Sequence, residues 1–465
     1  MGRFSTLIGL LTISSLASTA AYGDDLLEIL QTALQNDPTL NQAEAQYRAN
    51  HENVIQSRAS LLPSLGVGGS TSRVSSGPAS PVFRDVTDPV TGETVSVQVQ
   101  DGHSFARGIN NHSWGVNLSQ SIINLASWYS YQGARANDRA AAVNLAAQEQ
   151  DLIMRTATAY FNVLRAQDLL ETNLQEEEAA LRSLEQTQQR EEVGLVAITD
   201  VYDAQAAYDL ARNTTILQRD ALRAAFEALE AITGRAHPNI ELLREDFPVV
   251  EVDGSLNEWE AQAENNSLAI AAAEFNLEAS RRTLQARRSD HLPTVGFTGS
   301  YNHSVTGAIV RQGISIGGGA FDNTSLALDI SIPILAGGAT SSRRRAAEYN
   351  VLAAEESLEF TKRQLTQKIR NAYRRVNNDV LVIAQRQQSI TSTQTALDAT
   401  ELGAEVGTRN IVEVLRAREN LFRALREYAV ARYDYVIDTL VLRQVAGLLT
   451  PQDIIELNAW LEQGE

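Results

Sequence analysis

Proline is confined to a few places in this chain, and the long stretches without it limit the possible folds more than any other feature. The ten prolines lie at positions 38, 63, 78, 81, 89, 238, 248, 293, 333 and 451 of the 465 residues. Glycine is also absent from residues 134–193 and 339–402. At a rise of about 1.5 Å per residue, these segments predict helices roughly 90–100 Å long. Helices of that length favour coiled-coil packing.

The same plan occurs twice along the chain. Residues 62–66, Leu-Pro-Ser-Leu-Gly, match residues 292–296, Leu-Pro-Thr-Val-Gly. Further along, Val193-Gly194 matches Val406-Gly407. Self-similarity of this kind indicates an internal duplication. The first copy is longer than the second between positions 71 and 113, and a segment that tolerates such a length change is expected to be a surface loop.

This pattern predicts the domain organisation. We expect a signal peptide at 1–23, a first structural repeat at 24–234, an inter-repeat linker at 235–254, a second structural repeat at 255–447 and a C-terminal segment at 448–465. Each repeat is expected to contain a helix, two strands and a long hairpin. The expected strands lie near 64–72, 113–123, 294–303 and 324–334, and the expected hairpins at 125–234 and 338–447.

The start of the chain has the pattern of an export signal. Arg3 is followed by an apolar stretch from Leu7 to Leu16, and small residues precede Gly23. This order is typical of a secretory signal peptide cut before Asp24. An N-terminal membrane anchor is the alternative, but Ser and Thr dilute the apolar run. No later stretch approaches the roughly 20 apolar residues that a spanning helix needs.

The four expected strands alternate between apolar and small or polar residues. In the first, for example, Leu65 and Val67 alternate with Ser64 and Gly66. This pattern over about ten residues is typical of strands that cross an outer membrane, with lipid on one side and water on the other. A soluble, half-buried antiparallel sheet alternates in the same way.

Four strands cannot close a barrel, and hydrocarbon does not tolerate an open sheet edge. A shared barrel is therefore expected. Three copies supply 12 strands and two copies supply eight; side chains fill the interior of an eight-stranded barrel, so a conduit favours a homotrimer.

Composition excludes several functions. The 57 acidic and 39 basic residues give a net charge of −18, which argues against a nucleic-acid partner. The chain has no cysteine, and its six histidines lack the spacing of a zinc site. No nucleophile–base pairing is recognisable, so we expect no enzyme, no cofactor and no metal site.

The two matching segments that contain Gly194 and Gly407 resemble a known protein family. Residues 193–201, Val-Gly-Leu-Val-Ala-Ile-Thr-Asp-Val, and residues 406–415, Val-Gly-Thr-Arg-Asn-Ile-Val-Glu-Val-Leu, are similar to the hairpin-tip motifs of the TolC family of outer-membrane efflux and secretion channels. Residues 156–164 and Leu62-Pro63 also resemble the family, and the resemblance spans about residues 26–458.

The resemblance implies an α+β fold in which a trimeric, 12-stranded outer-membrane barrel continues as a periplasmic helical tunnel of coiled-coil hairpins. It implies a location in the cell outer membrane, extending into the periplasm. It implies assembly into a homotrimer. The other partners implied are outer-membrane lipid, a periplasmic adaptor (membrane fusion) protein and an inner-membrane transporter. The implied function is the exit duct of a tripartite efflux pump, a type I secretion system, or both.

The same resemblance gives roles to residues at the tips. Gly194, Leu195, Gly407 and Thr408 correspond to the adaptor-docking tips. Thr199, Asp200 and Arg409 correspond to a lock that joins neighbouring coiled coils and holds the tip shut. Two solvated charges at a helix start are the alternative interpretation of Asp200 and Arg409.

This sequence departs from the family pattern at two places. Ala404 replaces a tyrosine of the lock, which predicts a weaker resting lock. Relatives have two acidic residues one turn apart at the tunnel entrance, whereas this chain has Glu413 and then Arg416. Arg416 is expected either to pair with Glu413 or to form a separate positive ring. Both outcomes predict a reduced cation preference at the entrance.

Aromatic residues predict the orientation. Trp114 and Tyr301 lie near one end of the strands, and Trp128, Tyr129 and Tyr131 follow the other end, as in two interfacial girdles. The loops 73–111 and 304–323 are then expected to face the cell exterior. The rival function is a non-conducting periplasmic coiled-coil scaffold, which has no need of the four alternating strands.

Overall fold

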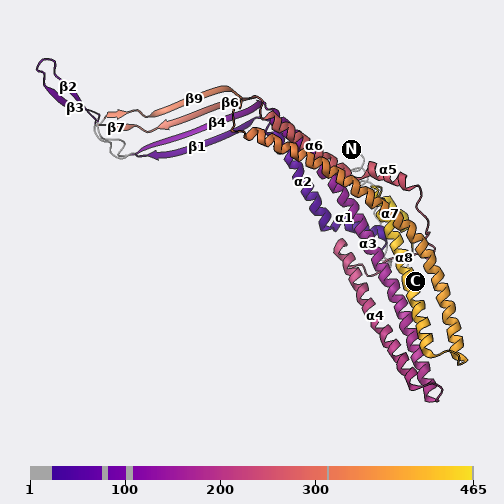
Figure 1. The fold of residues 1–465 in the computed structure, drawn as a ribbon. Helices are drawn as coiled ribbons and strands as arrows, with labels where there is room; N and C mark the ends of the chain where they lie inside the picture. Colours follow the sequence, from indigo (N-terminus) through magenta and orange to yellow (C-terminus); the bar gives the residue numbers. More distant parts are fainter. Residues whose placement is uncertain (1–23, 76–81, 101–107, 312–313, 463–465) are drawn as a thin grey trace, which may run out of the picture. The chain divides into compact units, whose positions relative to one another are not determined.

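The structure is a computed structural model that describes residues 24–75, 82–100, 108–311 and 314–462. The expected signal peptide, residues 1–23, lies outside the described residues. Long helices and one four-stranded antiparallel sheet make up most of the described chain (Figure 1).

The helices include two that are unusually long. They are α1 (Leu26–Asn36), α2 (Pro38–Ala59), α3 (Leu125–Glu192), α4 (Ile198–Thr233), α5 (Leu256–Asn266), α6 (Leu268–Ser289), α7 (Ala339–Glu405), α8 (Ile411–Val445) and α9 (Pro451–Asn458). Helix α3 has 68 residues and α7 has 67. Short turns at residues 193–197 and 406–410 join them to α4 and α8, which gives two long hairpins.

The main sheet has the strand order β1-β4-β6-β9. Its strands are β1 (Ser64–Val74), β4 (Ile109–Ile123), β6 (Thr294–Thr306) and β9 (Gly319–Ser331), all paired antiparallel. Val116 lies opposite Val67 on one side and Tyr301 on the other. Because side chains alternate along a strand, this register places most of the large apolar residues of the four strands on one face.

The strands differ in detail from those expected. Strands β4 and β9 begin at Ile109 and Gly319, several residues earlier than the alternation indicated, and β9 ends at Ser331. The two segments expected to be loops also contain short hairpins. These hairpins are β2 (Val82–Thr87) with β3 (Thr94–Gln100), and β7 (Ile309–Arg311) with β8 (Ile314–Ile316). Residues 94–100, Thr-Val-Ser-Val-Gln-Val-Gln, do alternate as a strand would, but the difference in length between the two repeats led to the whole segment being predicted as a loop.

The chain forms two compact units, and neither coincides with one sequence repeat. The first comprises the described parts of residues 1–48, 140–273 and 357–465, and the second comprises the described parts of residues 49–139 and 274–356. Each unit takes segments from both repeats. In the second unit, for example, β4 of the first repeat pairs with β6 of the second. The duplicated halves therefore fold against each other.

The first unit has its core between α3 and α8. Tyr160, Phe161 and Tyr433 are almost completely buried, and the ring centroids of Phe161 and Tyr433 are 6.5 Å apart. The Tyr433 hydroxyl donates a 2.7 Å hydrogen bond to Asp168 Oδ2. Burial raises the pKa of the Asp168 carboxyl. The Tyr160 hydroxyl donates to the carbonyl of Glu241, which ties the inter-repeat segment to α3.

The inter-repeat and C-terminal segments also belong to this core. Strand β5 (Leu242–Leu243) pairs with β10 (Leu461–Glu462). Leu243, Leu461 and Ile454 of α9 are buried. The segment that follows the second repeat thus closes the first unit and is part of the fold.

Among the residues that the structure describes, no helix combines the length and the hydrophobicity needed to cross a bilayer.

Candidate functional site: the two hairpin tips

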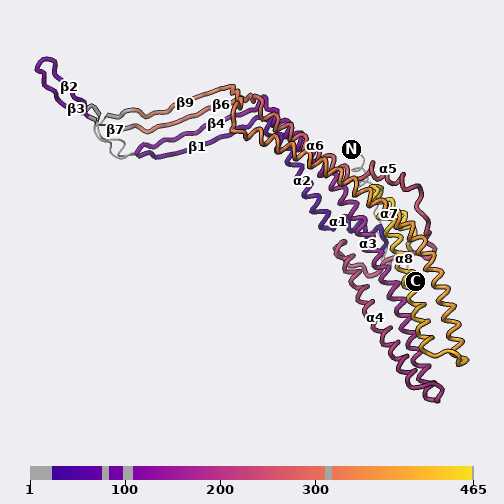
Figure 2. Tube along the Cα trace, in the orientation of Figure 1, coloured from indigo at the N-terminus to yellow at the C-terminus, as the bar shows by residue number. Residues whose placement is uncertain are grey.

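Both hairpins reverse at a glycine with a left-handed backbone. Gly194 has φ 75° and Gly407 has φ 77°, a region that glycine adopts without a steric penalty. Leu195 N–H donates to Arg190 O at 2.8 Å, and Thr408 N–H donates to Gly403 O at 2.8 Å, which satisfies carbonyls in the last turn of each long helix. The two turns lie at the same end of the helical unit (Figure 2).

The space around both glycines is open. A Cβ atom built at either position meets no heavy atom within 4 Å. Glycine is therefore required here by backbone conformation and not by crowding. Open surroundings also leave both turns accessible to another protein.

Exposed apolar side chains surround the two turns. Val193, Leu195 and Tyr202 near the first turn, and Leu402 and Val406 near the second, all expose about two thirds or more of their surface. Large apolar side chains grouped on a surface mark sites of interaction.

The two tips are capped differently. Asn410 Oδ1 accepts a 2.9 Å hydrogen bond from Glu413 N–H and caps the start of α8. Ala197, which occupies the same position before α4, provides no side-chain cap. Asn410 was not among the predicted site residues, although an Asn three residues before a Glu is a recognisable helix-start signal.

Arg409 has a partner within its own tip. Its guanidinium forms an ion pair with Glu413 at 2.6 Å, one helical turn away. The Arg409 side chain packs over Gly403, where a Cβ atom would lie 2.7 Å from Arg409 Cγ. Gly403 is therefore a further tip glycine, required by close approach, that the sequence analysis did not identify.

The other two lock residues lie on the first tip. Thr199 is exposed and Asp200 is half-buried in the first turn of α4. Within the described chain, no ion pair joins Asp200 to Arg409 or to another cation. A single copy therefore does not assemble the lock.

Glu413 and Arg416 do not pair with each other. Glu413 is paired with Arg409, whereas Arg416 is exposed and forms no ion pair with any described residue. In a single copy, the charge of Arg416 is therefore separate from the Arg409–Glu413 ion pair. Ala404, at the position of the family's tyrosine, is half-buried beside a small apolar cluster of Leu397, Val414 and Leu421.

A group of carboxylates lies between α7 and α8, further from the tip. Arg375 pairs with Asp438 at 3.1 Å, and Arg165 of α3 pairs with Asp434 at 3.1 Å. Asp379 lies near both aspartates, and its Oδ2 atom is buried without a hydrogen-bond partner. Burial, followed by repulsion from Asp438, raises the pKa of Asp379 to about 7. This cluster is not predictable from the sequence, because its members are far apart along the chain and meet only when the helices pack.

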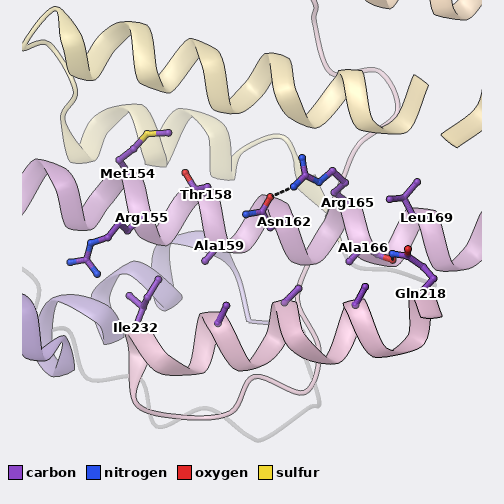
Figure 3. A pocket seen from close by; sticks show the side chains of 13 residues that line it. Met154, Arg155, Thr158, Ala159, Asn162, Arg165, Ala166, Leu169, Gln218 and Ile232 are labelled. Atoms are coloured by element: carbon purple, nitrogen blue, oxygen red, sulfur yellow. Dashed lines mark hydrogen bonds between the residues drawn. The ribbon is translucent and has the colours of Figure 1, made fainter. Parts of the chain in front are cut away.

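A groove runs between α3 and α4 (Figure 3). Its volume is about 640 Å³. The lining residues are Met154, Arg155, Thr158, Ala159, Asn162, Arg165, Ala166, Leu169, Gln218, Ala221, Ala225, Ala228 and Ile232. Most of this lining is small or apolar, and Arg165 donates to Asn162 Oδ1 at 2.6 Å along one edge. The groove has the chemistry of a packing surface.

No group of three or more His, Cys, Asp or Glu residues in the described part of the chain is arranged to hold a metal ion.

Two long helical hairpins together with a sheet of outer-membrane strand pattern define an outer-membrane channel subunit. The family model described as "Outer membrane efflux protein" matches residues 29–235 and 259–448, so the chain belongs to the TolC family of outer-membrane efflux proteins. It is a non-enzymatic transport channel of the outer membrane. This result confirms the predicted fold class, location and channel function.

Individual relatives agree with this assignment. The chain is 33% identical to Outer membrane protein TolC of Vibrio cholerae, over 96% of this chain and 95% of that protein. It is 27% identical to Proteases secretion protein PrtF of Dickeya chrysanthemi, over 97% of this chain and 94% of that protein. The structure is similar to that of CusC, with a TM-score of 0.75, 18% identity, and coverage of 93% and 95% of the two chains. At that identity the CusC match supports the fold alone.

Proposed function

We propose that three copies of this chain form one closed barrel and act as the exit duct of a tripartite efflux pump, a type I secretion system, or both. Family membership implies a trimeric efflux assembly. The observation that carries the proposal is the sheet itself, since β1 and β9 are edge strands in the described chain. An unpaired strand edge is not tolerated in hydrocarbon, so another copy must cover it.

The strand directions suit closure by rotation. Adjacent strands in the order β1-β4-β6-β9 are all antiparallel, so β1 and β9 run in opposite directions. Rotated copies therefore meet as an antiparallel β9–β1 pair. Three copies of this four-stranded sheet give 12 strands, which leave a water-filled interior, whereas eight strands leave an interior filled by side chains.

Aromatic pairs support the orientation in the membrane. The rings of Trp114 and Tyr301 are 5.3 Å apart near the end of the sheet that adjoins the expected external loops. Trp128 and Tyr131, with rings 6.0 Å apart, lie in the first turns of α3. Two such groups are typical of the two interfaces of an outer membrane. The segments 73–111 and 304–323 then face the exterior.

In the assembled duct, the groove between α3 and α4 receives helices of a neighbouring copy. Its alanines allow close helix approach, and most of its lining is uncharged. Covering the groove buries apolar surface and closes the wall of the helical tunnel.

The two tips bind the periplasmic adaptor. Gly194, Leu195, Gly407 and Thr408 are exposed in the described chain, beside the apolar side chains of both turns. An apolar, glycine-centred surface suits packing against the helices of an adaptor that an inner-membrane transporter recruits.

At rest, Arg409 of one coiled coil pairs with Asp200 of its neighbour, and Thr199 assists. The Arg409 side chain is about half exposed, and so its ion pair with Glu413 in the single chain is open to solvent. Exposed pairs of this kind contribute about 0.3–0.5 kcal/mol, so exchange of Glu413 for Asp200 costs little. Glu413 and Arg416 line the tunnel entrance as rings of opposite charge.

The oligomeric state and the conductance of the purified protein test the proposal. We expect a mass in detergent equal to three mature chains and ion conductance in a planar bilayer. A stable folded monomer overturns the trimer. A trimer that never conducts ions favours the coiled-coil scaffold over the duct.

A further inference from the structure

One face of the four-stranded sheet is apolar over most of its length. The register sets Leu65, Val67, Val116, Leu118, Leu326, Leu328 and Ile330 on this face. Leu326, Leu328 and Ile330 each expose more than 60% of their surface in the single chain. This face is therefore the one that meets lipid, and the opposite face lines the interior of the barrel.

The opposite face carries mostly small, hydroxyl and amide side chains. On β1 and β4 it presents Ser64, Gly66, Gly68, Ser70, Ser72, Asn111, Ser113, Gly115, Asn117 and Ser119. On β6 and β9 it presents Gly296, Thr298, Ser300, Asn302, Ser304, Phe321, Asn323, Ser325, Ala327 and Asp329. Among the described residues of these four strands, Asp329 is the one ionisable side chain on this face.

Asp329 has little to neutralise its charge. It lies opposite Gly296, which has no side chain, and it accepts a 2.9 Å hydrogen bond from the Thr298 hydroxyl. A hydroxyl donor stabilises the carboxylate and leaves its charge in place. No cation of the described strands shares this face with Asp329.

Asp322 on the same strand gives the contrast. It lies on the opposite face, where His303 Nδ1 is 2.6 Å from its Oδ1 atom and the Tyr301 hydroxyl donates to the same atom at 2.9 Å. Strand β9 thus carries one partnered carboxylate on the lipid side and one carboxylate without a cation on the lumen side. The pair provides a matched control on a single strand.

We propose that Asp329 sets the charge selectivity of the barrel, as one ring of three carboxylates on a face that carries no other ionisable side chain in the described residues of the four strands. The inference rests on the proposed trimeric duct. A carboxylate ring attracts small cations and repels anions, as in other cation-selective pores. The barrel therefore adds to the duct a second selectivity element, separate from Glu413 and Arg416 at the tip.

Reversal potentials under a salt gradient test this role. Asp329→Asn should lower the cation-to-anion permeability ratio roughly twofold at about 0.1 M salt, where the Debye length is about 10 Å. The difference should disappear near 1 M salt, where that length is about 3 Å. Asp322→Asn removes the same charge from the lipid face and should leave the ratio unchanged. Each variant is measured alone and with Arg409→Ser, so that a closed tip does not mask the barrel.

Cysteine labelling tests the position of the side chain independently of conductance. The natural chain has no cysteine, so Asp329→Cys and Leu328→Cys each introduce a single thiol. A charged, membrane-impermeant thiol reagent should modify position 329 and leave position 328 unmodified. A sulfonate reagent on Asp329→Cys should restore the cation preference, and an ammonium reagent should lower it further.

The outcomes separate this inference from the proposed function. Channels that conduct with the same permeability ratio in wild type and Asp329→Asn overturn the role of Asp329. Failure of position 329 to react overturns its place in the lumen. If no form of the protein conducts, the duct itself is wrong, whatever the labelling shows.

Discussion

The two long hairpins have the same helix–turn–helix backbone but different side chains at three equivalent positions, which are aspartate in the second hairpin and alanine in the first. When Gly194 is aligned with Gly407, the residues Asp379, Asp434 and Asp438 of the second hairpin correspond to Ala166, Ala221 and Ala225 of the first. The three alanines line the open groove between α3 and α4. The three aspartates lie between α7 and α8, where two of them pair with arginines. The two repeats therefore have the same helices, but the side chains available for contact with neighbouring helices differ between them.

The two tips also differ in their side chains at equivalent positions. Ala197 corresponds to Asn410, and Val196 corresponds to Arg409. Because of this, the second tip provides its own cap and its own ion pair, whereas Asp200 of the first tip forms no ion pair with any residue of the described chain. Within the described chain, the start of α4 at the first tip therefore lacks both a side-chain cap and an ion pair, whereas the start of α8 at the second tip has both.

The largest effect is expected at the lock. Arg409→Ser removes the cation of the proposed pair with Asp200, and three pairs of about 0.5–1 kcal/mol acting on one closure predict a rise of about ten- to a hundredfold in the open population. Resting conductance in a planar bilayer measures this rise.

Two further variants separate the lock from the pair seen within the tip. Asp200→Asn should raise conductance as Arg409→Ser does. Glu413→Gln removes only the partner of Arg409 within its own tip, so it should leave the tip closed. Equal conductance in wild type and Arg409→Ser, with the trimer intact, means that helix packing alone closes the tip.

A charge in the groove tests whether a neighbouring copy covers it. Ala225→Asp copies the second hairpin's residue into the first, and burying this unpaired carboxylate against a neighbour should destabilise the trimer by about 2 kcal/mol. Trimer dissociation on mild heating in detergent measures the effect.

Ala224→Asp is the matched control, since Ala224 is an exposed neighbour on α4 that does not line the groove. We expect its trimer to dissociate like wild type. Equal stability of both variants means that the groove stays open to solvent in the assembly.

Sequence reasoning reached the fold through features that are local and strongly periodic. Glycine and proline spacing predicted the helical hairpins, and alternation predicted the four strands, because side-chain period follows directly from backbone geometry. It did not reveal Asp379, whose neighbours Asp434 and Asp438 meet it only when α7 and α8 pack. It also missed that Arg409 pairs with Glu413, since an arginine at a helix start can reach several carboxylates and only the folded tip selects one.

A smaller effect is expected from the acidic cluster. Burial and Asp438 raise the pKa of Asp379 from 3.8 to about 7, so the folded protein binds this proton more tightly than the unfolded chain. The free-energy cost of keeping Asp379 charged in the folded protein is fully present above pH 7 and decreases as the pH falls from 7 toward 4. Asp379→Asn should therefore raise the free energy of unfolding at pH 8 by about 1 kcal/mol, after discounting for solvent screening.

The pH profile distinguishes this from a general stabilisation. The advantage of Asp379→Asn over wild type should shrink as the pH is lowered to 5, where Asp379 of the wild type is protonated. Ala166→Asn, at the equivalent position of the first hairpin, provides the comparison and should show no such dependence. An advantage that is constant between pH 5 and 8 contradicts the assigned cause.

The smallest effect is expected from exchanging the helix caps of the two tips. Asn410→Ala removes the acceptor of the Glu413 N–H and should destabilise the start of α8 by about 0.5–1 kcal/mol. Ala197 already has the extended backbone of a capping residue, with φ −79° and ψ 152°, so Ala197→Asn should stabilise the start of α4 by a similar amount. Amide hydrogen exchange at the first turns of the two helices measures both changes. If Ala197→Asn leaves exchange at Asp200 unchanged, a missing cap is not what distinguishes the first tip, and the difference between the tips rests on Arg409 and Glu413 instead.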